Sequence, residues 1–161
     1  MRRALCSSVF AVAGLLAASS LIAQNVDPIV GTWMLNLTKS TFTPGPPPKS
    51  TTVGIEPFEN GYKTIQDMVD AQGKSTQSED LIRFDGKQYP FRSPVRPDVP
   101  ETIEYRRIDA YTYERLTRVD GTVTSTIHVA ISPDGRTRTS SQTGTFSQGP
   151  GTRNVMVFDK Q

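Results

Sequence analysis

Residues 102–131 read TIEYRRIDAYTYERLTRVDGTVTSTIHVAI and contain three runs in which polar and apolar residues alternate. Alternation with a period of two is typical of strands that bury one face. The runs cover residues 102–108, 111–118 and 122–131, and the turn pairs Asp109-Ala110 and Asp120-Gly121 separate them. Because connections this short force neighbouring strands to pair antiparallel, the stretch predicts an antiparallel meander.

The rest of the chain after residue 23 continues this pattern. Its 19 threonines against three alanines favour strands over helices, and no window shows the apolar spacing of a capped helix. Further strands are predicted at residues 30–37, 51–57, 62–70, 78–84, 87–91, 136–143 and 153–159. The predicted fold class is all-β, a single antiparallel up-and-down barrel of about 8–10 strands; the alternative, a Greek-key sandwich, needs longer crossovers.

Three connections carry further information. Asp85-Gly86 predicts a two-residue hairpin that joins the strands at 78–84 and 87–91. Residues 39–50 contain four prolines, and proline fixes φ and removes a donor, so this segment is predicted to be an extended surface loop. Residues 93–100 are also proline-rich and are predicted to form a crossing that separates the two halves of the chain.

The first 23 residues have the features of a secretory signal peptide. Arg2 and Arg3 supply a basic start, an apolar run without charges follows, and Ala23 offers a small residue before the cleavage point. We therefore expect export to the periplasm or the extracellular medium, with a single domain at residues 24–161. A retained membrane anchor is the alternative interpretation of the same apolar run.

Removal of that segment changes the charge and the thiol content. The whole chain has 18 Lys and Arg against 16 Asp and Glu, and Arg2 and Arg3 leave with the segment, so the remainder is formally neutral. A neutral chain has no electrostatic basis for binding nucleic acid or an anionic membrane surface. Cys6 is the only cysteine and leaves as well. Disulfides, thiol catalysis and cysteine-ligated metals are thereby excluded for the remaining domain.

Gly31-Thr32-Trp33, near the start of the first predicted strand, resembles the Gly-x-Trp motif of the lipocalins and fatty-acid-binding proteins, the calycin superfamily. In that superfamily the tryptophan closes one end of the barrel and packs against a basic residue from near the end of the chain. The resemblance therefore implies a barrel closure formed by Gly31, Trp33 and Arg153, with the guanidinium lying over the indole.

The whole of residues 24–161 also resembles the uncharacterised secreted lipocalin-like proteins of bacteria. The shared motifs are Gly-Thr-Trp, Phe-Asp-Gly-Lys-x-Tyr-Pro at residues 84–90 and Ser-Pro-Asp-Gly at residues 132–135. Two departures bear on function. Small fatty-acid-binding proteins have an Arg-x-Tyr pair where this chain has Arg153 followed by Val155, and a proline loop replaces their helical lid. The familiar carboxylate clamp is therefore not expected.

Few side chains suggest catalysis or metal binding. His128 is the only histidine, and alternation places it opposite the apolar face of Val123 and Ile127, in solvent or a polar lumen. One imidazole can act as a lone general base but does not build a metal site. Glu79 and Asp80 are adjacent and point to opposite faces of a strand, so they do not form a catalytic pair. We predict no catalytic residue, no metal and no cofactor.

The first hairpin of the opening stretch carries the most polar face. A two-residue loop would set Tyr113 opposite Arg106 and Arg115 opposite Glu104. The other face would then hold the core residues Ile103, Tyr105 and Leu116. One interpretation of the polar face is a cross-strand charge ladder in water. The other is that Arg106, Tyr113 and Arg115 face the lumen and bind a polar or anionic group.

By analogy with the resemblance, we expect a monomeric exported protein that binds a small, partly apolar or amphipathic ligand inside the barrel. One alternative is an interaction module whose barrel is filled by its own side chains and whose loops at residues 39–50 and 93–100 contact another protein or the cell surface. A cofactor-free enzyme is the third and least favoured of these functions. An open cavity in the barrel distinguishes the first two.

Overall fold

A computed structural model of the protein describes residues 26–93, 96–146 and 149–161. The expected signal peptide lies outside these residues. Ten strands and one short 3-10 helix form the regular structure of the described ranges: β1 (Gly31–Leu35), η1 (Leu37–Lys39), β2 (Ser50–Phe58), β3 (Gly61–Val69), β4 (Ser75–Ile82), β5 (Tyr89–Ser93), β6 (Arg96–Arg107), β7 (Thr112–Val119), β8 (Thr122–Ile131), β9 (Thr137–Phe146) and β10 (Gly149–Lys160). No helix in these ranges is long and apolar enough to cross a membrane.

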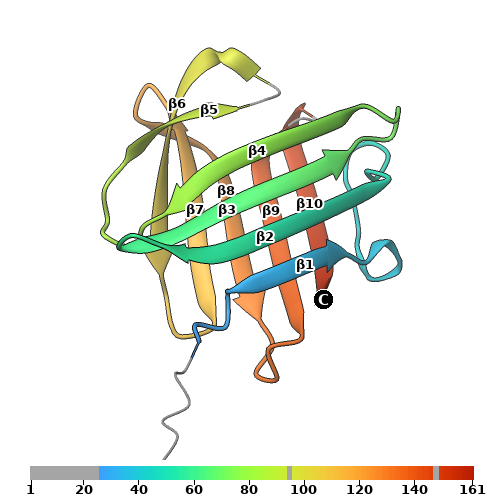
Figure 1. The fold of residues 1–161 in the computed structure, drawn as a ribbon. Coiled ribbons are helices and arrows are strands. Elements are labelled where there is room, and N and C mark those ends of the chain that lie inside the picture. The colour runs from blue at the N-terminus through green and yellow to red at the C-terminus, as the bar shows by residue number, and fades with distance from the viewer. Residues whose placement is uncertain (1–25, 94–95, 147–148) are drawn as a thin grey trace, which may run out of the picture.

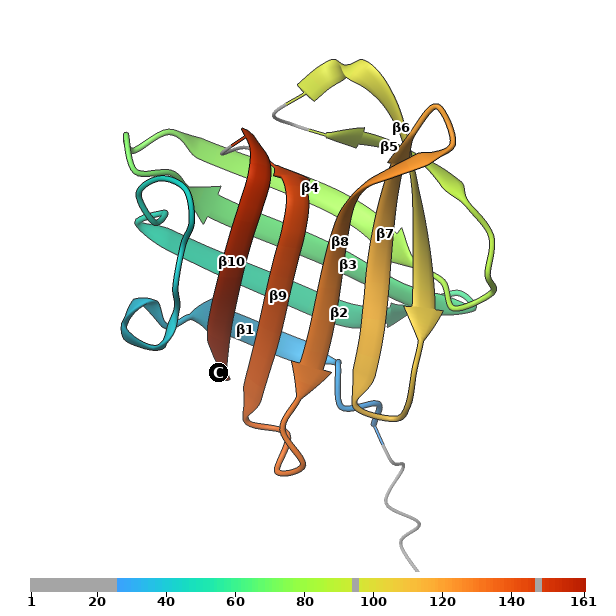
Figure 2. The same cartoon turned by 180° about the vertical axis from the view of Figure 1, so that it is seen from behind.

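The strands form one antiparallel sheet in the order β4-β3-β2-β1-β10-β9-β8-β7-β6-β5. Strand β1 pairs with both β2 and β10, whereas β4 and β5 form the two free edges. The sheet folds over so that β1–β4 form one layer that crosses β7–β10 behind it (Figure 1), and the view from behind shows the same two layers (Figure 2). The architecture is the predicted up-and-down barrel, nearly closed, and not a Greek-key sandwich.

The hairpin predicted at Asp85-Gly86 is wrong. The two residues do form a turn, in which the Asp85 carboxylate accepts hydrogen bonds from the Lys87 N–H at 3.1 Å and from the Tyr89 hydroxyl at 2.5 Å. However, the strands on either side are opposite edges of the sheet and do not pair. Strand β4 ends at Ile82, so the chain has left the sheet before the turn. The Phe84 ring then packs edge-on against the rings of Tyr62, Tyr105 and Tyr113.

The crossing predicted at residues 93–100 is also wrong, because most of this segment belongs to β6. Strands β5 and β6 pair antiparallel, with Ser93 opposite Arg96. Pairing between β6 and β7 begins only at Thr102. Pro97 and Pro100 therefore lie where β6 extends beyond β7, and the hydrogen-bond donors that they lack are not needed on that side.

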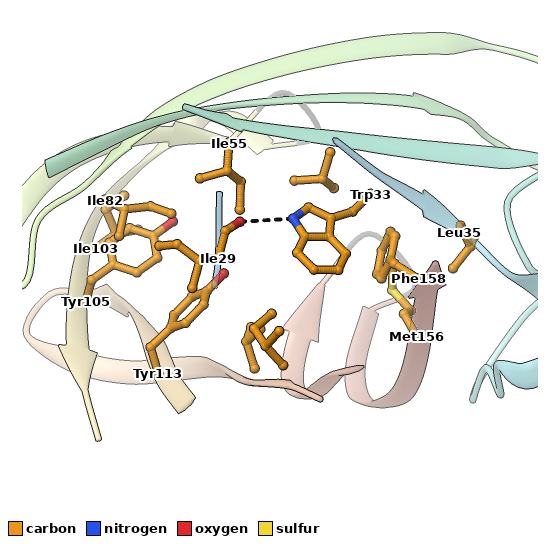
Figure 3. Packing of buried hydrophobic residues seen from close by; sticks show 13 residues of the cluster. Ile29, Trp33, Leu35, Ile55, Ile82, Ile103, Tyr105, Tyr113, Met156 and Phe158 are labelled. Carbon is orange, nitrogen blue, oxygen red and sulfur yellow. Dashed lines mark hydrogen bonds between the residues drawn. The ribbon is translucent and has the colours of Figure 1, made fainter. Parts of the chain in front are cut away.

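Trp33 is fully buried at one end of the barrel. Its indole N–H donates to the Ile29 carbonyl at 3.0 Å, as Figure 3 shows. Lys160 supplies the basic group over the indole, with Nζ 5.0 Å from the ring centroid. The expectation for Arg153 is wrong, because β1 and β10 pair with Trp33 opposite Lys160 and leave Arg153 exposed.

The glycine of the Gly-x-Trp motif has a steric role. Gly31 has φ +137°, and a Cβ at this position would lie 2.5 Å from Lys160 Cε. Glycine therefore leaves room for the lysine stem to pass over the indole. The buried hydrophobic cluster around Trp33 consists of Ile29, Leu35, Val53, Ile55, Ile82, Ile103, Tyr105, Tyr113, Val129, Ile131, Met156 and Phe158.

Candidate functional site

The barrel contains a cavity of about 890 Å³, near the upper end of the roughly 300–1,000 Å³ that is usual for small-molecule sites. Its wall is partly apolar and partly polar. The apolar side chains include Phe42, Val53, Met68, Ile82, Phe91, Ile127, Val129 and Met156. A cavity of this size argues against the alternative of a barrel filled by its own side chains.

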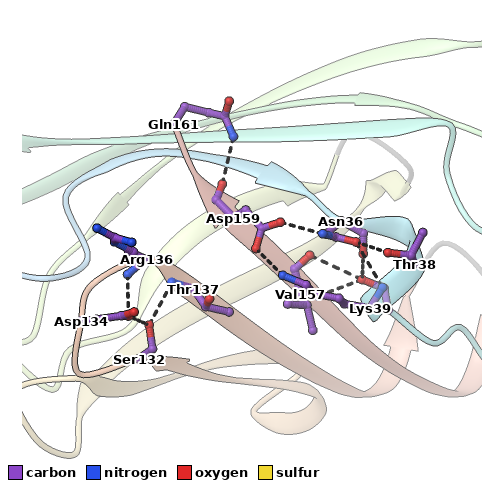
Figure 4. A network of polar contacts seen from close by, with 11 residues as sticks. Asn36, Thr38, Lys39, Ser132, Asp134, Arg136, Thr137, Val157, Asp159 and Gln161 are labelled. Atoms are coloured by element: carbon purple, nitrogen blue, oxygen red, sulfur yellow. Dashed lines mark hydrogen bonds and ion pairs between the residues drawn. The ribbon is translucent and has the colours of Figure 1, made fainter.

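The connector between β1 and β2 forms part of the cavity wall. Its helical part is limited to the three residues of η1, as expected for a connector without a helical lid. Pro44, Pro46 and Pro48 line the cavity. A polar network holds its start: Asp159 accepts a hydrogen bond from Asn36 Nδ2 at 2.6 Å and pairs with Lys39 Nζ at 3.0 Å (Figure 4). The loop thus has one end tied to the last strand.

The first hairpin of the opening stretch has a register different from the predicted one. Arg106 lies opposite Glu114, and Arg107 opposite Tyr113. The Ile108 N–H donates to the Thr112 carbonyl at 2.9 Å, so the loop has three residues, 109–111, rather than two. This shift of one position separates the predicted group. Tyr113 and Arg115 line the cavity, whereas Arg106 faces outward.

The outer face of this hairpin carries the charge ladder. Glu104 forms ion pairs with Arg106 and with Arg118, the latter at 2.8 Å. The hydrogen bond from Arg106 is the main cause that holds the pKa of Glu104 below its ordinary value. Leu116, expected in the core, is buried at 8% exposure, but it lies opposite Glu104 and outside the hydrophobic cluster of the interior. The lumen interpretation is therefore wrong for Arg106; for Tyr113 and Arg115 it stays a prediction.

Asp80, Tyr105 and Arg115 form a polar group inside the barrel. The Tyr105 hydroxyl lies 3.0 Å from both Asp80 oxygens, and Arg115 Nε lies 3.8 Å from Asp80 Oδ2. Because Asp80 is on β4 and its partners are on β6 and β7, these contacts link the two sides of the open edge. Burial raises the pKa of Asp80 although Arg115 and Tyr105 oppose the shift. Burial is also the main cause of the strongly raised pKa of Tyr105.

Arg138 is the main cavity residue that the sequence analysis missed. It is 8% exposed, its Cζ lies 5.0 Å from the Phe158 ring centroid, and Nη2 lies 3.4 Å from the Tyr113 hydroxyl. Within the described residues, Arg138 Nε has no hydrogen-bond partner. Strand alternation puts Arg138 on one face with Ser140 and Gln142, but both faces of this strand are polar, so the pattern did not show which face is inside.

A third arginine of the cavity wall is paired. Arg96 Nη2 lies 2.5 Å from Glu101 Oε1, and the Glu101 side chain is 1% exposed. Arg115 has Asp80 beside it, whereas the described partners of Arg138 are a phenol and an aromatic ring. The charged cavity-lining residues are Asp70, Lys74, Asp80, Arg96, Glu101, Arg115 and Arg138. With all of them ionised, the described wall has one positive charge in excess.

His128 faces outward. Its ring Nδ1 lies 3.4 Å from Glu114 Oε1, and 44% of its side chain is exposed. Val123, predicted on the apolar face of the same strand, is exposed instead. Thr117 and Arg118 of β7 pair with Ser125 and Val123 of β8, so β8 has one extra residue between these pairs, and the faces of β8 reverse there. Across residues 26–93, 96–146 and 149–161, no group of three or more His, Cys, Asp or Glu side chains is placed to hold a metal ion.

Comparisons with known proteins show the fold. No protein-family model matches the chain, and no curated protein matches its sequence. Among solved structures, a fatty acid binding protein from Schistosoma mansoni in complex with arachidonic acid matches with a TM-score of 0.58 and 12% identity, over 83% of this chain and 96% of that one. The zebrafish ileal bile acid-binding protein complexed with cholic acid matches with a TM-score of 0.51 and 10% identity, over 83% and 99% of the two chains.

A third match is As-p18, an extracellular fatty acid binding protein, with a TM-score of 0.53 and 12% identity, over 84% of this chain and 97% of that one. These neighbours are fatty acid and bile acid binding proteins. At such low identity the likeness concerns the fold alone. The matches carry no information about the charged side chains that line this cavity.

Proposed function

We propose that this protein binds a small amphipathic anion, with a monocarboxylate as the first candidate, inside its barrel and without catalysing a reaction on it. The structural neighbours, which are fatty acid and bile acid binding proteins, support a binding role for the fold. The observation that carries the proposal for this chain is Arg138. It is a nearly buried guanidinium in an open cavity, with no carboxylate as its described partner.

Electrostatics favours a single negative charge in the ligand. Burying a charge is costly unless it is paired. The pairs Arg96–Glu101 and Arg115–Asp80 balance themselves, so one anionic headgroup beside Arg138 neutralises the described wall. An arginine fork also binds a carboxylate with two parallel hydrogen bonds.

The apolar part of the ligand has a surface to contact. Phe42, Phe91, Ile127 and Met156 line the same cavity as the arginines. Arg115 lies with Cζ 4.4 Å from the Phe91 ring centroid, so polar and apolar walls meet there. An amphipathic molecule satisfies both kinds of wall, whereas a purely apolar one leaves Arg138 desolvated.

Displacement of a bound fluorescent probe tests the proposal. Dodecanoate is titrated into the protein loaded with anilinonaphthalenesulfonate, and the same titration is run on Arg138→Met and on Arg136→Met, which changes an exposed arginine two residues away. We expect Arg138→Met to weaken dodecanoate binding by about tenfold or more, since hydrogen bonds to charged groups contribute about 1.5–3 kcal/mol. Arg136→Met should bind like the native chain. Equal binding by all three proteins, or no displacement from the native chain, would contradict the proposal.

The proposal extends to where the protein acts. We propose that residues 1–23 direct export, as in the secreted lipocalin-like proteins that the chain resembles, and that the exported domain is a periplasmic or extracellular monomer. Expression of the full chain in a bacterial host, followed by mass measurement of the product, tests this. A cleaved product outside the cytoplasm, with the mass of a monomer, is expected. An uncleaved chain that stays in the cytoplasm would contradict it.

A further inference from the structure

We infer that the ligand carries a hydroxyl or a similar hydrogen-bonding group along its apolar body, in addition to the anionic headgroup. This inference rests on the proposed function and narrows the ligand class. Its basis is a set of uncharged polar side chains beyond the cavity arginines.

These side chains form what we call the polar band: Gln66, Ser78, Thr117, Ser125 and Gln142, all of which line the cavity. They come from both layers of the barrel. Gln66 lies opposite Ser78 on the β3–β4 side, and Thr117 lies opposite Ser125 on the β7–β8 side. A ligand body in the cavity therefore has polar groups on both sides.

The position of the polar band along the strands sets its distance from the headgroup. Gln142 follows Arg138 by four residues on β9 and lies level with Arg115, because both residues pair with Ile127 of β8. Thr117 lies two residues further along β7 than Arg115. Because a strand advances about 3.3 Å per residue, these positions lie about 13–20 Å from Arg138 along the strands. A group in the middle or the outer half of a long-chain acid reaches this level when its carboxylate lies at Arg138.

Desolvation favours a ligand with a matching polar group. A plain alkyl chain that fills the band expels water from hydroxyl and amide groups and offers them no hydrogen bond in exchange. A hydroxyl on the ligand replaces that water. Sites built to hydrogen-bond a hydroxyl discriminate strongly against the analogue that lacks it. If water instead stays on the band, the ligand's hydroxyl brings no advantage.

Three matched acids test the inference on the full domain: octadecanoate, 10-hydroxyoctadecanoate and 2-hydroxyoctadecanoate, each in competition with bound anilinonaphthalenesulfonate. We expect 10-hydroxyoctadecanoate to bind about tenfold more tightly than octadecanoate. The hydroxyl of 2-hydroxyoctadecanoate lies beside the headgroup, so this acid should bind within about twofold of octadecanoate.

Substitution of the polar band should remove the preference. Thr117→Val keeps the shape of the side chain and deletes its hydroxyl, and Ser78→Ala does the same on the other wall. Thr139→Val, on the outward face of β9, is the matched control. We expect each band variant to reduce the preference for 10-hydroxyoctadecanoate by about threefold or more and the control to keep it. The two variants lie on different walls of the cavity. If one of them fails to fold, the preference measured with the other still tests the inference.

The outcomes separate the inference from the function on which it rests. Binding of 10-hydroxyoctadecanoate that is equal to or weaker than that of octadecanoate overturns the inference and leaves the proposed function standing. A preference that survives both band variants also overturns it. Failure of all three acids to displace the probe overturns the proposed function, and the inference with it.

Discussion

Asp80→Asn should change the pH dependence of anion binding. Asp80 Oδ2 lies 3.8 Å from Arg115 Nε, and Asp80 lines the same cavity as Arg138, so its negative charge repels a ligand anion in that cavity. Burial raises the pKa of Asp80 above its ordinary value. As pH falls through that raised pKa, Asp80 loses its charge, its repulsion of the ligand anion ends, and anion affinity should increase.

The size of the effect follows from the geometry. At an assumed separation of about 7 Å between Asp80 and the ligand anion, two unit charges interact by roughly 2 kcal/mol at an effective dielectric of about 20. That energy corresponds to a change of about 30-fold in Kd. Neutral asparagine keeps an oxygen that accepts the hydrogen bond from Tyr105 but removes the repulsion.

Direct titration of anilinonaphthalenesulfonate from about pH 8 down through the ordinary carboxyl range to about pH 4 measures the effect, because the sulfonate stays charged throughout. The native protein should bind more tightly as pH falls. Asp80→Asn should bind tightly at every pH and show a flat profile, with circular dichroism confirming that the fold persists. A native profile that is flat, or an Asp80→Asn profile as steep as the native one, would refute the reasoning.

Three further outcomes are expected. Gly31→Ala should lower the free energy of unfolding by about 1–3 kcal/mol in urea titrations, because its Cβ would meet the Lys160 stem at positive φ; an unchanged midpoint would show that the stem moves aside freely. Lys160→Met should alter the fluorescence of Trp33 and cost about 0.5–2 kcal/mol, while Arg153→Met should change neither. Burial raises the pKa of Asp27, but the hydrogen bonds that it accepts from Tyr62 and Arg107 outweigh burial and lower the pKa below its ordinary value. Stability should therefore fall as pH drops through the ordinary carboxyl range. Thermal melts of Asp27→Asn should show a smaller fall.

The sequence predicted strand faces well where one face is apolar. Ile127, Val129 and Ile131 alternate with polar residues, and all three face the interior. On β9 the alternation separates two polar sets, so the hydrophobic pattern could not place Arg138 inside. The most important cavity charge was therefore missed for a physical reason, namely that a polar lumen and solvent select the same kinds of side chain.

Pairing between distant strands was harder to predict than local turns. The preference of Asp85-Gly86 for a turn was correct, but whether the flanking strands pair depends on where the sheet has its free edges. The base over Trp33 depends similarly on the register of β1 with β10, which selects Lys160. A one-residue difference in the turn after β6 was enough to turn Arg106 outward, since side chains alternate along a strand.

The claim that the cavity binds an anion through its arginines is tested most directly by comparing dodecanoate with dodecan-1-ol. The two ligands share an alkyl chain and differ in the charge that Arg138 would contact. Isothermal titration of the purified domain should show one binding site for dodecanoate, with a Kd at least about tenfold lower than that of the alcohol. Equal affinities, or tighter binding of the alcohol, would contradict the claim.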